Sequence, residues 1–300
     1  MKTILIAGAT GLIGSAFLNT FYNQYNIILI TRDTSKFLAK KNRINLYTWK
    51  EFEDNKTTII EQADYVINLA GEPILNLFTN KHKQRLYSSR INSTKTLVEA
   101  INQASKKPDC LINASAIGFY DHQPSIQTYT ESNEAGSDFI SHLCKEWESE
   151  ASKTSIRSVQ LRIGLVLANN KGFLKSLLPP FRAFIGGHLG NGKQACPWIH
   201  IDDVVKIIHF IIEKQAISGP VNLTSPGSCD LKTFCNAISQ CIKRPSWLHI
   251  PSFVIKLLFA DLAPTLLHTP FVKPEKLLNH NYTFTHTDLQ KTLDHTLKNR

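Results

Sequence analysis

The sequence lacks several features that mark other classes of protein. It has no run of about 20 apolar residues, the length that a membrane-spanning helix requires. Even the apolar stretch Val204–Ile212 contains Lys206 and His209. No internal repeat and no low-complexity segment is present, so neither a repeat protein nor a disordered chain is indicated. We expect a globular protein with no membrane partner.

Paired cysteines and a full-length secretion signal are absent as well. The six cysteines form no Cys-x-x-Cys motif and no metal-type pairing with the histidines. We therefore expect reduced thiols, a cytoplasmic location and no metal site. The apolar run after Met1 and Lys2 resembles a secretion signal, but it covers only Thr3–Ala7 before Gly8 interrupts it. We interpret this run as a strand of the folded protein.

Acidic residues are fewer than basic ones. The 24 Asp and Glu and the 34 Lys and Arg give a formal net charge of +10. Such a charge is typical of proteins that bind nucleic acid or an anionic membrane. The basic residues are scattered, however, and no basic stripe with interleaved aromatic residues is present. An anionic small molecule explains the charge at least as well, so we do not expect nucleic acid as a partner; its binding would weaken steeply with salt.

The N-terminal segment carries the most informative pattern of the chain. Lys2–Gly14 is an apolar run that ends in three glycines with the spacing Gly-x-x-Gly-x-x-Gly. Helical periodicity follows over Leu12–Tyr22, and a second apolar run covers Ile28–Thr31. This order predicts a strand, a phosphate-binding turn, a helix and a strand, which together open a dinucleotide-binding domain.

Each of the three glycines has a physical role in this interpretation. Gly8 permits a tight turn, Gly11 lets the backbone approach a pyrophosphate, and Gly14 lets the helix pack closely on the strand. The pyrophosphate would lie at the helix N-terminus, where unpaired N–H groups and the positive end of the helix dipole favour an anion. An ordinary strand-to-helix turn without a ligand is the alternative.

The end of the second strand indicates which dinucleotide is bound. NAD-binding chains usually carry an acid about 20 residues beyond the glycines, and here that place holds Thr31 followed by Arg32. A guanidinium offers a planar fork to a 2′-phosphate, and such a hydrogen bond contributes about 1.5–3 kcal/mol, or about tenfold to a hundredfold in affinity. We therefore expect NADP. The alternative is that Arg32 is a solvated charge beside Asp33.

Strands and helices alternate through the first half of the chain. The pattern predicts strands over residues 63–71, 110–116 and 158–164 and helices over residues 81–105 and 138–152. This alternation predicts an α/β fold with a Rossmann-type doubly wound parallel sheet. Ligands of such sheets lie beyond the carboxyl ends of the strands, where Gly8, Arg32, Ala70, Ser115 and Arg162 fall.

The pattern becomes less regular after Leu165. Pro179-Pro180 and the glycines between 186 and 192 predict a loop-rich region, and prolines in the tail from Pro251 predict short, separated helices. Between them we expect helices over 201–214 and 231–242 and a strand over 221–223. We predict a dinucleotide-binding domain over residues 1–165, completed by parts of 198–225. A smaller substrate-side lobe then covers 166–300, with a helical tail from about residue 250.

Several motifs, in order along most of the chain, resemble those of a known family. They are Gly8–Gly14, Asn68–Ile74, Ser89-Arg90, Ala114–Tyr120, Leu161–Leu167, Gly186–Gln194, Pro197–Asp202 and Gly219–Thr224. Together they resemble the extended and atypical short-chain dehydrogenase/reductases, in particular the NADP-binding epimerase family proteins related to nucleotide-sugar epimerases. The tail from Ile250 resembles that family's small C-terminal domain. The resemblance implies oxidoreductase or epimerase-like activity on a carbonyl or alcohol, and only the family name suggests a nucleotide sugar.

The resemblance also implies a set of NADP contacts. They come from the glycine turn, from the ends of the second and third predicted strands, from the long helix and from beyond Arg162. The residues are Gly8, Thr10, Gly11, Leu12, Ile13, Gly14, Thr31, Arg32, Leu69, Ala70, Gly71, Arg90 and Leu165. A surface salt bridge is the alternative role of Arg90.

One departure from the wider superfamily concerns catalysis. Those enzymes use a tyrosine whose pKa is lowered by a lysine one helical turn later, but alignment on Glu148 places Ile140 and Cys144 at the two positions. We expect Ser115 and Tyr120 to polarise the substrate oxygen instead. Tyr120 could act as an acid if a cation such as Lys145 lowers its pKa; otherwise it packs beside the nicotinamide or closes the loop.

Two further residues are weighed as candidates. Glu72, just past a strand end, is a candidate base or substrate ligand, or a cap of the next segment. His200, with acidic residues Asp202 and Asp203 at a helix start, is more typical of a structural role.

The sequence therefore leaves two functions open, an NADP-dependent enzyme acting on a small molecule and a non-catalytic NADP(H) sensor or scaffold. Monomer and homodimer both stay open as well.

Overall fold

Short apolar segments of the chain pair into a seven-stranded sheet with the order β12-β7-β5-β4-β1-β2-β3. The strands are β1 (Thr3–Ala7), β2 (Asn26–Thr31), β3 (Ile44–Thr48), β4 (Tyr65–Asn68), β5 (Cys110–Ala116), β7 (Arg157–Ile163) and β12 (Gly219–Leu223). The pairs β1–β2, β2–β3, β1–β4 and β4–β5 are parallel. The chain runs outward from β1 to β3 and then crosses to β4 on the other side of β1, so the topological switch point lies between β1 and β4.

The structure is a computed structural model and describes residues 1–34, 44–74, 79–122, 127–169, 171–259 and 262–298. The chain divides into two compact units. The first comprises Met1–Ser115, Lys145–Leu161 and Val205–Pro220, and the second comprises Ala116–Cys144, Arg162–Val204 and Val221–Arg300. The strands β5, β7 and β12 begin in the first unit and end in the second.

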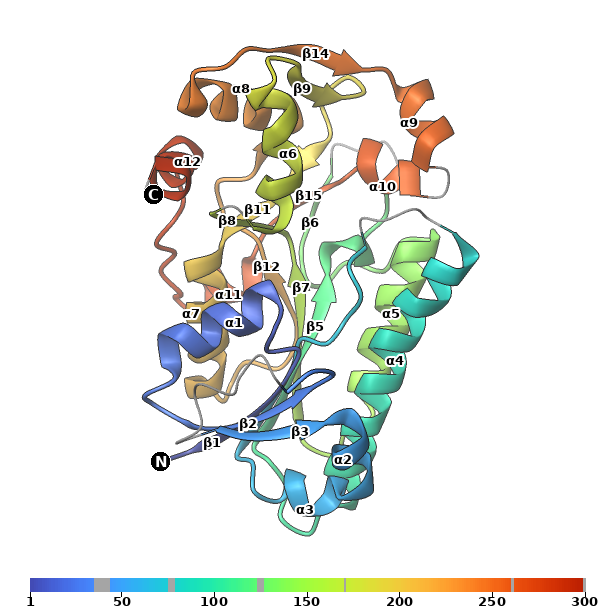
Figure 1. The fold of residues 1–300 in the computed structure, drawn as a ribbon, viewed down its shortest axis with the longest axis vertical. Coiled ribbons are helices and arrows are strands. Elements are labelled where there is room, and N and C mark those ends of the chain that lie inside the picture. The colour runs from blue at the N-terminus through green and yellow to red at the C-terminus, as the bar shows by residue number, and fades with distance from the viewer. Residues whose placement is uncertain (35–43, 75–78, 123–126, 170, 260–261, 299–300) are drawn as a thin grey trace. The chain divides into compact units, whose positions relative to one another are not determined.

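Helices cover both faces of the sheet (Figure 1). The helices α1 (Leu12–Phe21) and α7 (Ile201–Glu213) lie on one face, and α4 (Asn80–Gln103) and α5 (Phe139–Ala151) lie on the other. The short helices α2 (Trp49–Asp54) and α3 (Lys56–Ile60) follow β3. Because a parallel sheet covered on both faces needs apolar residues on both sides of each strand, β1 and β4 are almost entirely buried.

The core of the first unit lies between the sheet and α4. Leu97 and Ile101 of α4 pack with Leu5, Val66 and Leu111 of the strands, and all five are fully buried. These helix positions recur every four residues, which is the period that places side chains on one face of a helix. The predicted Rossmann-type doubly wound fold is therefore confirmed.

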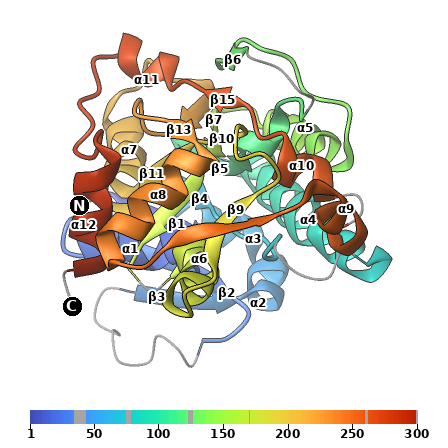
Figure 2. The same cartoon turned by 90° about the horizontal axis from the view of Figure 1, so that it is seen from above.

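The second unit is built from short strand pairs and helices. The pairs are β8 (Leu165–Ala168) with β11 (Trp198–His200), β9 (Gly186–Leu189) with β14 (Ser246–Ile250), β10 (Ala195–Cys196) with β13 (Cys229–Asp230), and β6 (Thr128–Tyr129) with β15 (Phe271–Val272). Its helices are α6 (Gly172–Arg182), α8 (Leu231–Ile242), α9 (Ser252–Phe259), α10 (Ala263–Leu267), α11 (Glu275–Asn279) and α12 (Leu289–Lys298). The helix α12 lies beside α8 (Figure 2), and Leu293 of α12 shares a core with Leu174 of α6 and Phe234 of α8.

The prediction of a loop at Pro179-Pro180 was wrong, because both prolines lie inside α6. Proline interrupts a helix chiefly by removing a backbone hydrogen bond. Here the amphipathic face formed by Leu174, Leu178 and Phe181 is buried in the core of the second unit. The apolar burial of this face outweighs the two missing N–H donors near the end of the helix.

The long helices were predicted to within a few residues, whereas β3, α2 and α3 were not predicted. The strand β9 lies where the glycines between 186 and 192 predicted a loop. The helix expected over 81–105 is α4, and the one expected over 231–242 is α8.

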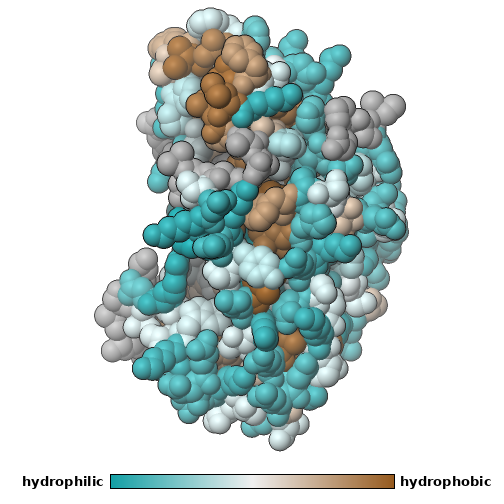
Figure 3. All heavy atoms as spheres, turned by 90° about the vertical axis from the view of Figure 1, so that its right-hand side faces the viewer, coloured by the Kyte–Doolittle hydropathy of each residue, from teal (hydrophilic) through white to brown (hydrophobic). Residues whose placement is uncertain are grey.

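Apolar side chains of α9, namely Phe253, Leu257 and Leu258, are exposed and form a hydrophobic cluster at the top of Figure 3. Among the described residues, no helix combines the length and the hydropathy that crossing a membrane demands.

Candidate functional site

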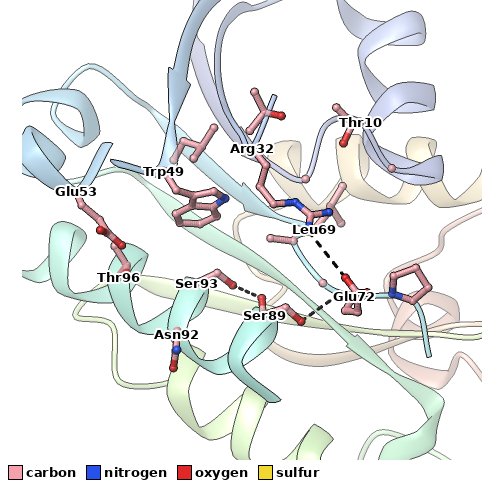
Figure 4. Close-up of a pocket in the computed structure, with 17 residues that line it drawn as sticks. Thr10, Arg32, Trp49, Glu53, Leu69, Glu72, Ser89, Asn92, Ser93 and Thr96 are labelled. Carbon is pink, nitrogen blue, oxygen red and sulfur yellow. Dashed lines mark hydrogen bonds and ion pairs between the residues drawn. The ribbon is translucent and has the colours of Figure 1, made fainter. Parts of the chain in front are cut away.

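A cavity of about 420 Å³ lies in the first unit, at the carboxyl ends of β1, β2 and β4. This is the place where ligands of doubly wound sheets bind, and the volume falls within the range of small-molecule pockets. Figure 4 shows its lining residues. They are Gly8, Thr10, Gly11, Ile30, Thr31, Arg32, Trp49, Glu53, Leu69, Ala70, Gly71, Glu72, Pro73, Ser89, Asn92, Ser93 and Thr96.

The turn after β1 requires glycine. Gly8 has a φ of +85°, and a Cβ there would lie 2.5 Å from the carbonyl carbon and oxygen of Leu69. A Cβ on Gly14 would lie 2.6 Å from the carbonyl oxygen of Gly8. The first glycine thus fits the close approach of β1 to the end of β4, and the last fits the close packing of α1 on the turn.

The start of α1 offers backbone donors to an anion. Gly11 is the N-cap residue, it has no side chain with which to cap the helix, and the first turn contains no acidic residue. A Cβ on Gly11 would meet only the carbonyl oxygen of Gly8, at 3.3 Å. The open backbone and the positive end of the helix dipole make this turn suitable for a phosphate group.

The end of β2 places a positive charge at the edge of the cavity. The side chain of Arg32 is 85% exposed, and its Nη1 lies 3.9 Å from Oε2 of Glu72. An exposed ion pair of this length contributes little to stability, so an anionic ligand can compete for the guanidinium. Thr31 is buried, and its Oγ1 donates to the carbonyl oxygen of Asp33 and accepts from the Asp33 backbone N–H.

A buried polar network positions the end of β4. The side-chain amide of Asn68 donates to Thr94 Oγ1 at 2.9 Å and to Asn113 Oδ1 at 2.7 Å, and its Oδ1 accepts from the backbone N–H of Ala70 at 3.2 Å. Trp147 Nε1 also donates to Thr94 Oγ1. Sequence reasoning missed this network, although Asn68 and Asn113 stand out as amides within otherwise apolar strands.

The long helix α4 holds the segment that follows β4. The backbone N–H of Glu72 donates to Ser89 Oγ at 3.0 Å, and Arg90 Nη2 donates to the carbonyl oxygen of Glu72 at 3.0 Å. Arg90 is buried, its guanidinium lies over the ring of Trp147, and a Cβ on Gly71 would contact it at 3.4 Å. Arg90 therefore fixes the backbone of Gly71 and Glu72 from behind the cavity wall.

Several lining residues were not predicted from the sequence. Ser89, Asn92, Ser93 and Thr96 share one face of α4, and Trp49 and Glu53 come from α2. Figure 4 shows Trp49 and Glu53 of α2 beside the polar side chains of α4. The helical spacing of the four α4 residues was the available signal, but it does not reveal which helix face lies toward the sheet end.

The predicted cofactor contacts divide into two groups. Eight line the cavity, and five do not belong to its described lining. Those that line it are Gly8, Thr10, Gly11, Thr31, Arg32, Leu69, Ala70 and Gly71. The others are Leu12, Ile13 and Gly14 of α1, Arg90 of α4, and Leu165, which belongs to the second unit and pairs with Trp198.

Ser115, at the carboxyl end of β5, is buried beside a carboxylate. Its Oγ donates to Glu148 Oε1 at 2.6 Å, and Glu148 itself is only 8% exposed. A serine hydroxyl has one proton and two lone pairs. The proton is therefore committed to Glu148, and the oxygen keeps a lone pair for a further partner.

Tyr120 belongs to a polar cluster of the second unit. Its hydroxyl donates to Asn222 Oδ1 at 2.6 Å and accepts from Arg162 Nη1 at 2.9 Å. Burial raises the pKa of Tyr120 to about 12, even though Arg162 and Asn222 act in the opposite direction. The cation that contacts the phenol is thus Arg162, whereas the sequence analysis suggested Lys145. Arg162 does not bring the pKa of Tyr120 below its ordinary value, because the cost of burying a phenolate is larger.

The positions of the usual tyrosine and lysine are occupied by packing residues. Ile140 and Cys144 of α5 are both buried, and they are the side chains nearest to a Cβ built on Gly118, with Ile140 Cγ2 at 2.6 Å and Cys144 Sγ at 3.9 Å. An isoleucine has no proton to exchange, and two buried packing residues do not reproduce the usual pair of tyrosine and lysine.

Comparison with known proteins shows full-length relatives. The family model described as the NAD dependent epimerase/dehydratase family matches residues 4–223, and a domain of unknown function, DUF1731, matches residues 250–296. An epimerase family protein of Staphylococcus haemolyticus is 33% identical over 296 residues, which is 97% of each chain. The epimerase family protein YfhF of Bacillus subtilis is 31% identical over 301 residues, 99% of this chain and 98% of that protein.

A solved structure shows the same arrangement of the chain. The human epimerase family protein SDR39U1, crystallised with NADPH, is 28% identical and superposes with a TM-score of 0.89. The match covers 99% of this chain and 100% of the human one.

Proposed function

Because this chain belongs to the NAD dependent epimerase/dehydratase family, we propose that its first unit binds NADP(H) in the cavity at the ends of β1, β2 and β4. We further propose that the protein is an oxidoreductase or epimerase-like enzyme that acts on a carbonyl or alcohol of a small molecule. Membership in the family, with its C-terminal domain, confirms the resemblance inferred from the motifs.

The observation that carries the proposal is the glycine turn at the start of α1. The φ of +85° at residue 8 and the close contact with Leu69 require a glycine there. Gly11 leaves the start of the helix without a side-chain cap. These are the features that a pyrophosphate needs from a protein backbone. The pyrophosphate would lie on this turn, and the nicotinamide would supply or accept the hydride.

Arg32 supports NADP rather than NAD. Its exposed guanidinium lies at the end of β2, the place where a chain selective for NAD usually carries an acid. A 2′-phosphate would displace the weak pairing of Arg32 with Glu72 and gain a bidentate partner. The presence of NADPH in the human relative supports the same choice.

In the enzymatic proposal, two hydroxyl groups assist hydride transfer. NADPH held by the glycine turn and Arg32 would supply a hydride for the carbonyl carbon. Tyr120 would donate a proton to the carbonyl oxygen, so that an alcohol would form. Arg162, which already donates to the phenol oxygen, would stabilise the phenolate that remains. Ser115 would turn its hydroxyl from Glu148 toward the substrate oxygen.

A second candidate, a non-catalytic NADP(H) sensor, is favoured by one observation. The protons of Ser115 and Tyr120 are both donated to partners within the protein, to Glu148 and Asn222. A site whose acidic protons are so engaged suits binding better than proton transfer. The two candidates share the cofactor and differ in whether bound NADPH is consumed.

A paired titration with NADPH and NADH tests the cofactor. We expect the wild-type protein to bind NADPH more tightly, and Arg32→Ala to remove about tenfold to a hundredfold of that preference. Arg85→Ala, which removes an exposed arginine of α4 outside the cavity lining, serves as the matched control and should keep the preference. Equal binding of the two nucleotides by the wild type would contradict NADP selectivity, and binding of neither would contradict both candidates.

The second experiment separates the enzyme from the sensor. The protein saturated with NADPH is mixed with a panel of aldehydes, ketones and nucleotide sugars, and the absorbance of the reduced nicotinamide is followed. Oxidation that is slowed by Ser115→Ala and by Tyr120→Phe supports the enzyme. Tight binding without oxidation across the panel supports the sensor.

A further inference from the structure

The second unit holds a cluster of metal-ligating side chains that the proposed function does not use. His200, Asp202, His286 and His295 each offer one ligand atom, and these atoms all lie within 4.8 Å of one another. We propose that the four side chains form a binding site for a divalent transition metal, with Zn²⁺ as the best-fitting ion.

The side chains converge on the carboxylate of Asp202. Nδ1 of His200 lies 3.5 Å from Asp202 Oδ2, and Nε2 of His286 lies 3.6 Å from the same oxygen. The rings of His200 and His286 are 3.9 Å apart between centroids, and the ring of His295 is 5.6 Å from His200 and 5.4 Å from His286. The three imidazoles therefore surround one carboxylate.

These separations suit tetrahedral coordination. Bonds of about 2.0–2.1 Å to imidazole and carboxylate place neighbouring donor atoms about 3.3–3.4 Å apart. The two distances to Asp202 are already close to that value. The other donor pairs, all within 4.8 Å, would have to close by up to about 1.4 Å to reach it. Nδ1 of His200 now accepts a hydrogen bond from the backbone N–H of Asp202 at 3.2 Å. To bind a metal, the ring would turn this lone pair toward the ion.

The surrounding residues hold the ligands in place. The buried carboxylate of Asp203 accepts from the backbone N–H groups of Thr285 and His286, each at 2.9 Å, and Ser225 Oγ donates to the carbonyl oxygen of His286 at 3.0 Å. The backbone of His286 is thus fixed on both sides. Such supporting hydrogen bonds are typical of metal sites, where they orient the ligands.

The ligand set indicates both the metal and its role. Imidazole suits zinc, nickel and copper, and a single carboxylate with three histidines fills a tetrahedral site without an open position. A closed site is typical of structural metals. It would join the end of β11 and the start of α7, which carry His200 and Asp202, to α12, which carries His295.

No metal site was predicted, because the cysteines form no Cys-x-x-Cys motif and no metal-type pairing with the histidines. The four ligands instead come from a strand end, a helix start, a loop and a helix far along the chain. No short sequence motif predicts a metal site whose ligands are so far apart in the chain. Only the folded second unit brings the residues together.

The test uses the untagged, full-length protein after treatment with a chelator and dialysis. Zn²⁺ is titrated into the wild type, into His295→Ala and His286→Gln, and into His142→Ala, an exposed histidine of α5 that serves as the control. We expect one equivalent to bind the wild type and the control, with binding at least about tenfold weaker in the two cluster variants. A rise in Tm with Zn²⁺ should follow the same division.

Cobalt supplies a second readout that does not depend on variants folding. Co²⁺ bound by the wild type should show the intense visible absorption of a tetrahedral site, and excess Zn²⁺ should displace it. Binding of Zn²⁺ that is equally weak in all four proteins, or a pale octahedral Co²⁺ spectrum in the wild type, would overturn the proposal.

Discussion

The cavity of the first unit and the polar clusters of the second unit differ in how the sequence encodes them. The cavity is formed by short segments that each follow a strand, such as Gly8, Arg32 and Ala70. The topology of a parallel sheet brings the carboxyl ends of its strands together at one edge. A local pattern that predicts strands therefore predicts this site as well.

The clusters of the second unit have no such rule. Tyr120 contacts Arg162 and Asn222, and Asp203 contacts Thr285 and His286, so each cluster joins segments distant in the sequence. Their assembly depends on irregular packing of short strands and loops. A site at the strand ends of a parallel sheet can therefore be predicted from the sequence. A site formed by irregular packing of distant segments cannot.

The largest expected effect comes from a Cβ at the glycine turn. Gly8→Ala places a Cβ 2.5 Å from the backbone of Leu69 at a φ of +85°, so we expect the free energy of unfolding to fall by about 3 kcal/mol and NADPH binding to be lost. Urea denaturation and NADPH titration measure the two effects. Unchanged stability would show that the turn can relax to accommodate a Cβ, and that this part of the cavity is less rigid than we infer.

The matched variant is Gly11→Ala. Its Cβ has only one neighbour within 4 Å, at 3.3 Å, and its φ of −72° suits any residue. We expect a stability change of less than about 1 kcal/mol, with weaker NADPH binding because the methyl group faces the phosphate position. A variant that binds as the wild type does would move the proposed phosphate site away from this turn.

Most of the fold could be predicted because apolar runs and helical periodicity are strong signals. The prediction failed at β3, whose residues are only partly buried, and at α6, where packing of Leu174 and Phe181 overrides two prolines. In both cases the deciding force is a tertiary contact. Local patterns do not contain that information.

The candidate site was predictable at the strand ends and not beyond them. Trp49 was missed with the strand that precedes it, and Ser93 was missed because the sequence does not tell which polar face of α4 meets the sheet. Ser115 pairs with Glu148, and Tyr120 pairs with Asn222. Both partners lie on other elements, and no spacing in the sequence relates them to Ser115 or Tyr120.

The next effect tests a distant contact of the second unit. Asp203 is fully buried, and each of its oxygens accepts one backbone N–H. In Asp203→Asn an amide NH₂ would face one of these donors, so we expect the free energy of unfolding to fall by about 2–3 kcal/mol. The comparison is made in a chelating buffer with Asp202→Asn, a half-exposed neighbour whose replacement should cost less than about 1 kcal/mol. Equal effects would mean that the buried contact is not special.

Tyr120 should reveal its cluster at alkaline pH. Its folded pKa of about 12 lies above the ordinary value of 10, so the folded protein keeps a proton that the unfolded chain releases. The stabilisation is complete below pH about 10 and falls by about 2–3 kcal/mol as the pH rises to about 12. Unfolding by urea at several pH values should show this decline in the wild type, and a smaller decline in Tyr120→Phe. Parallel profiles for the two proteins would contradict the assignment.

The smallest expected effect concerns the pair of Asp138 and His122 before α5. Burial disfavours the charge of Asp138, but the hydrogen bonds from His122 and from the backbone N–H of Ser141 hold its pKa below the ordinary value of 3.8. A lowered folded pKa stabilises the protein above the unfolded pKa, and this contribution is lost as the pH falls through the folded pKa. Because asparagine can still cap the helix, Asp138→Asn isolates the contact with His122. We expect it to cost about 1 kcal/mol at neutral pH, with the difference from the wild type shrinking as the pH falls below about 4.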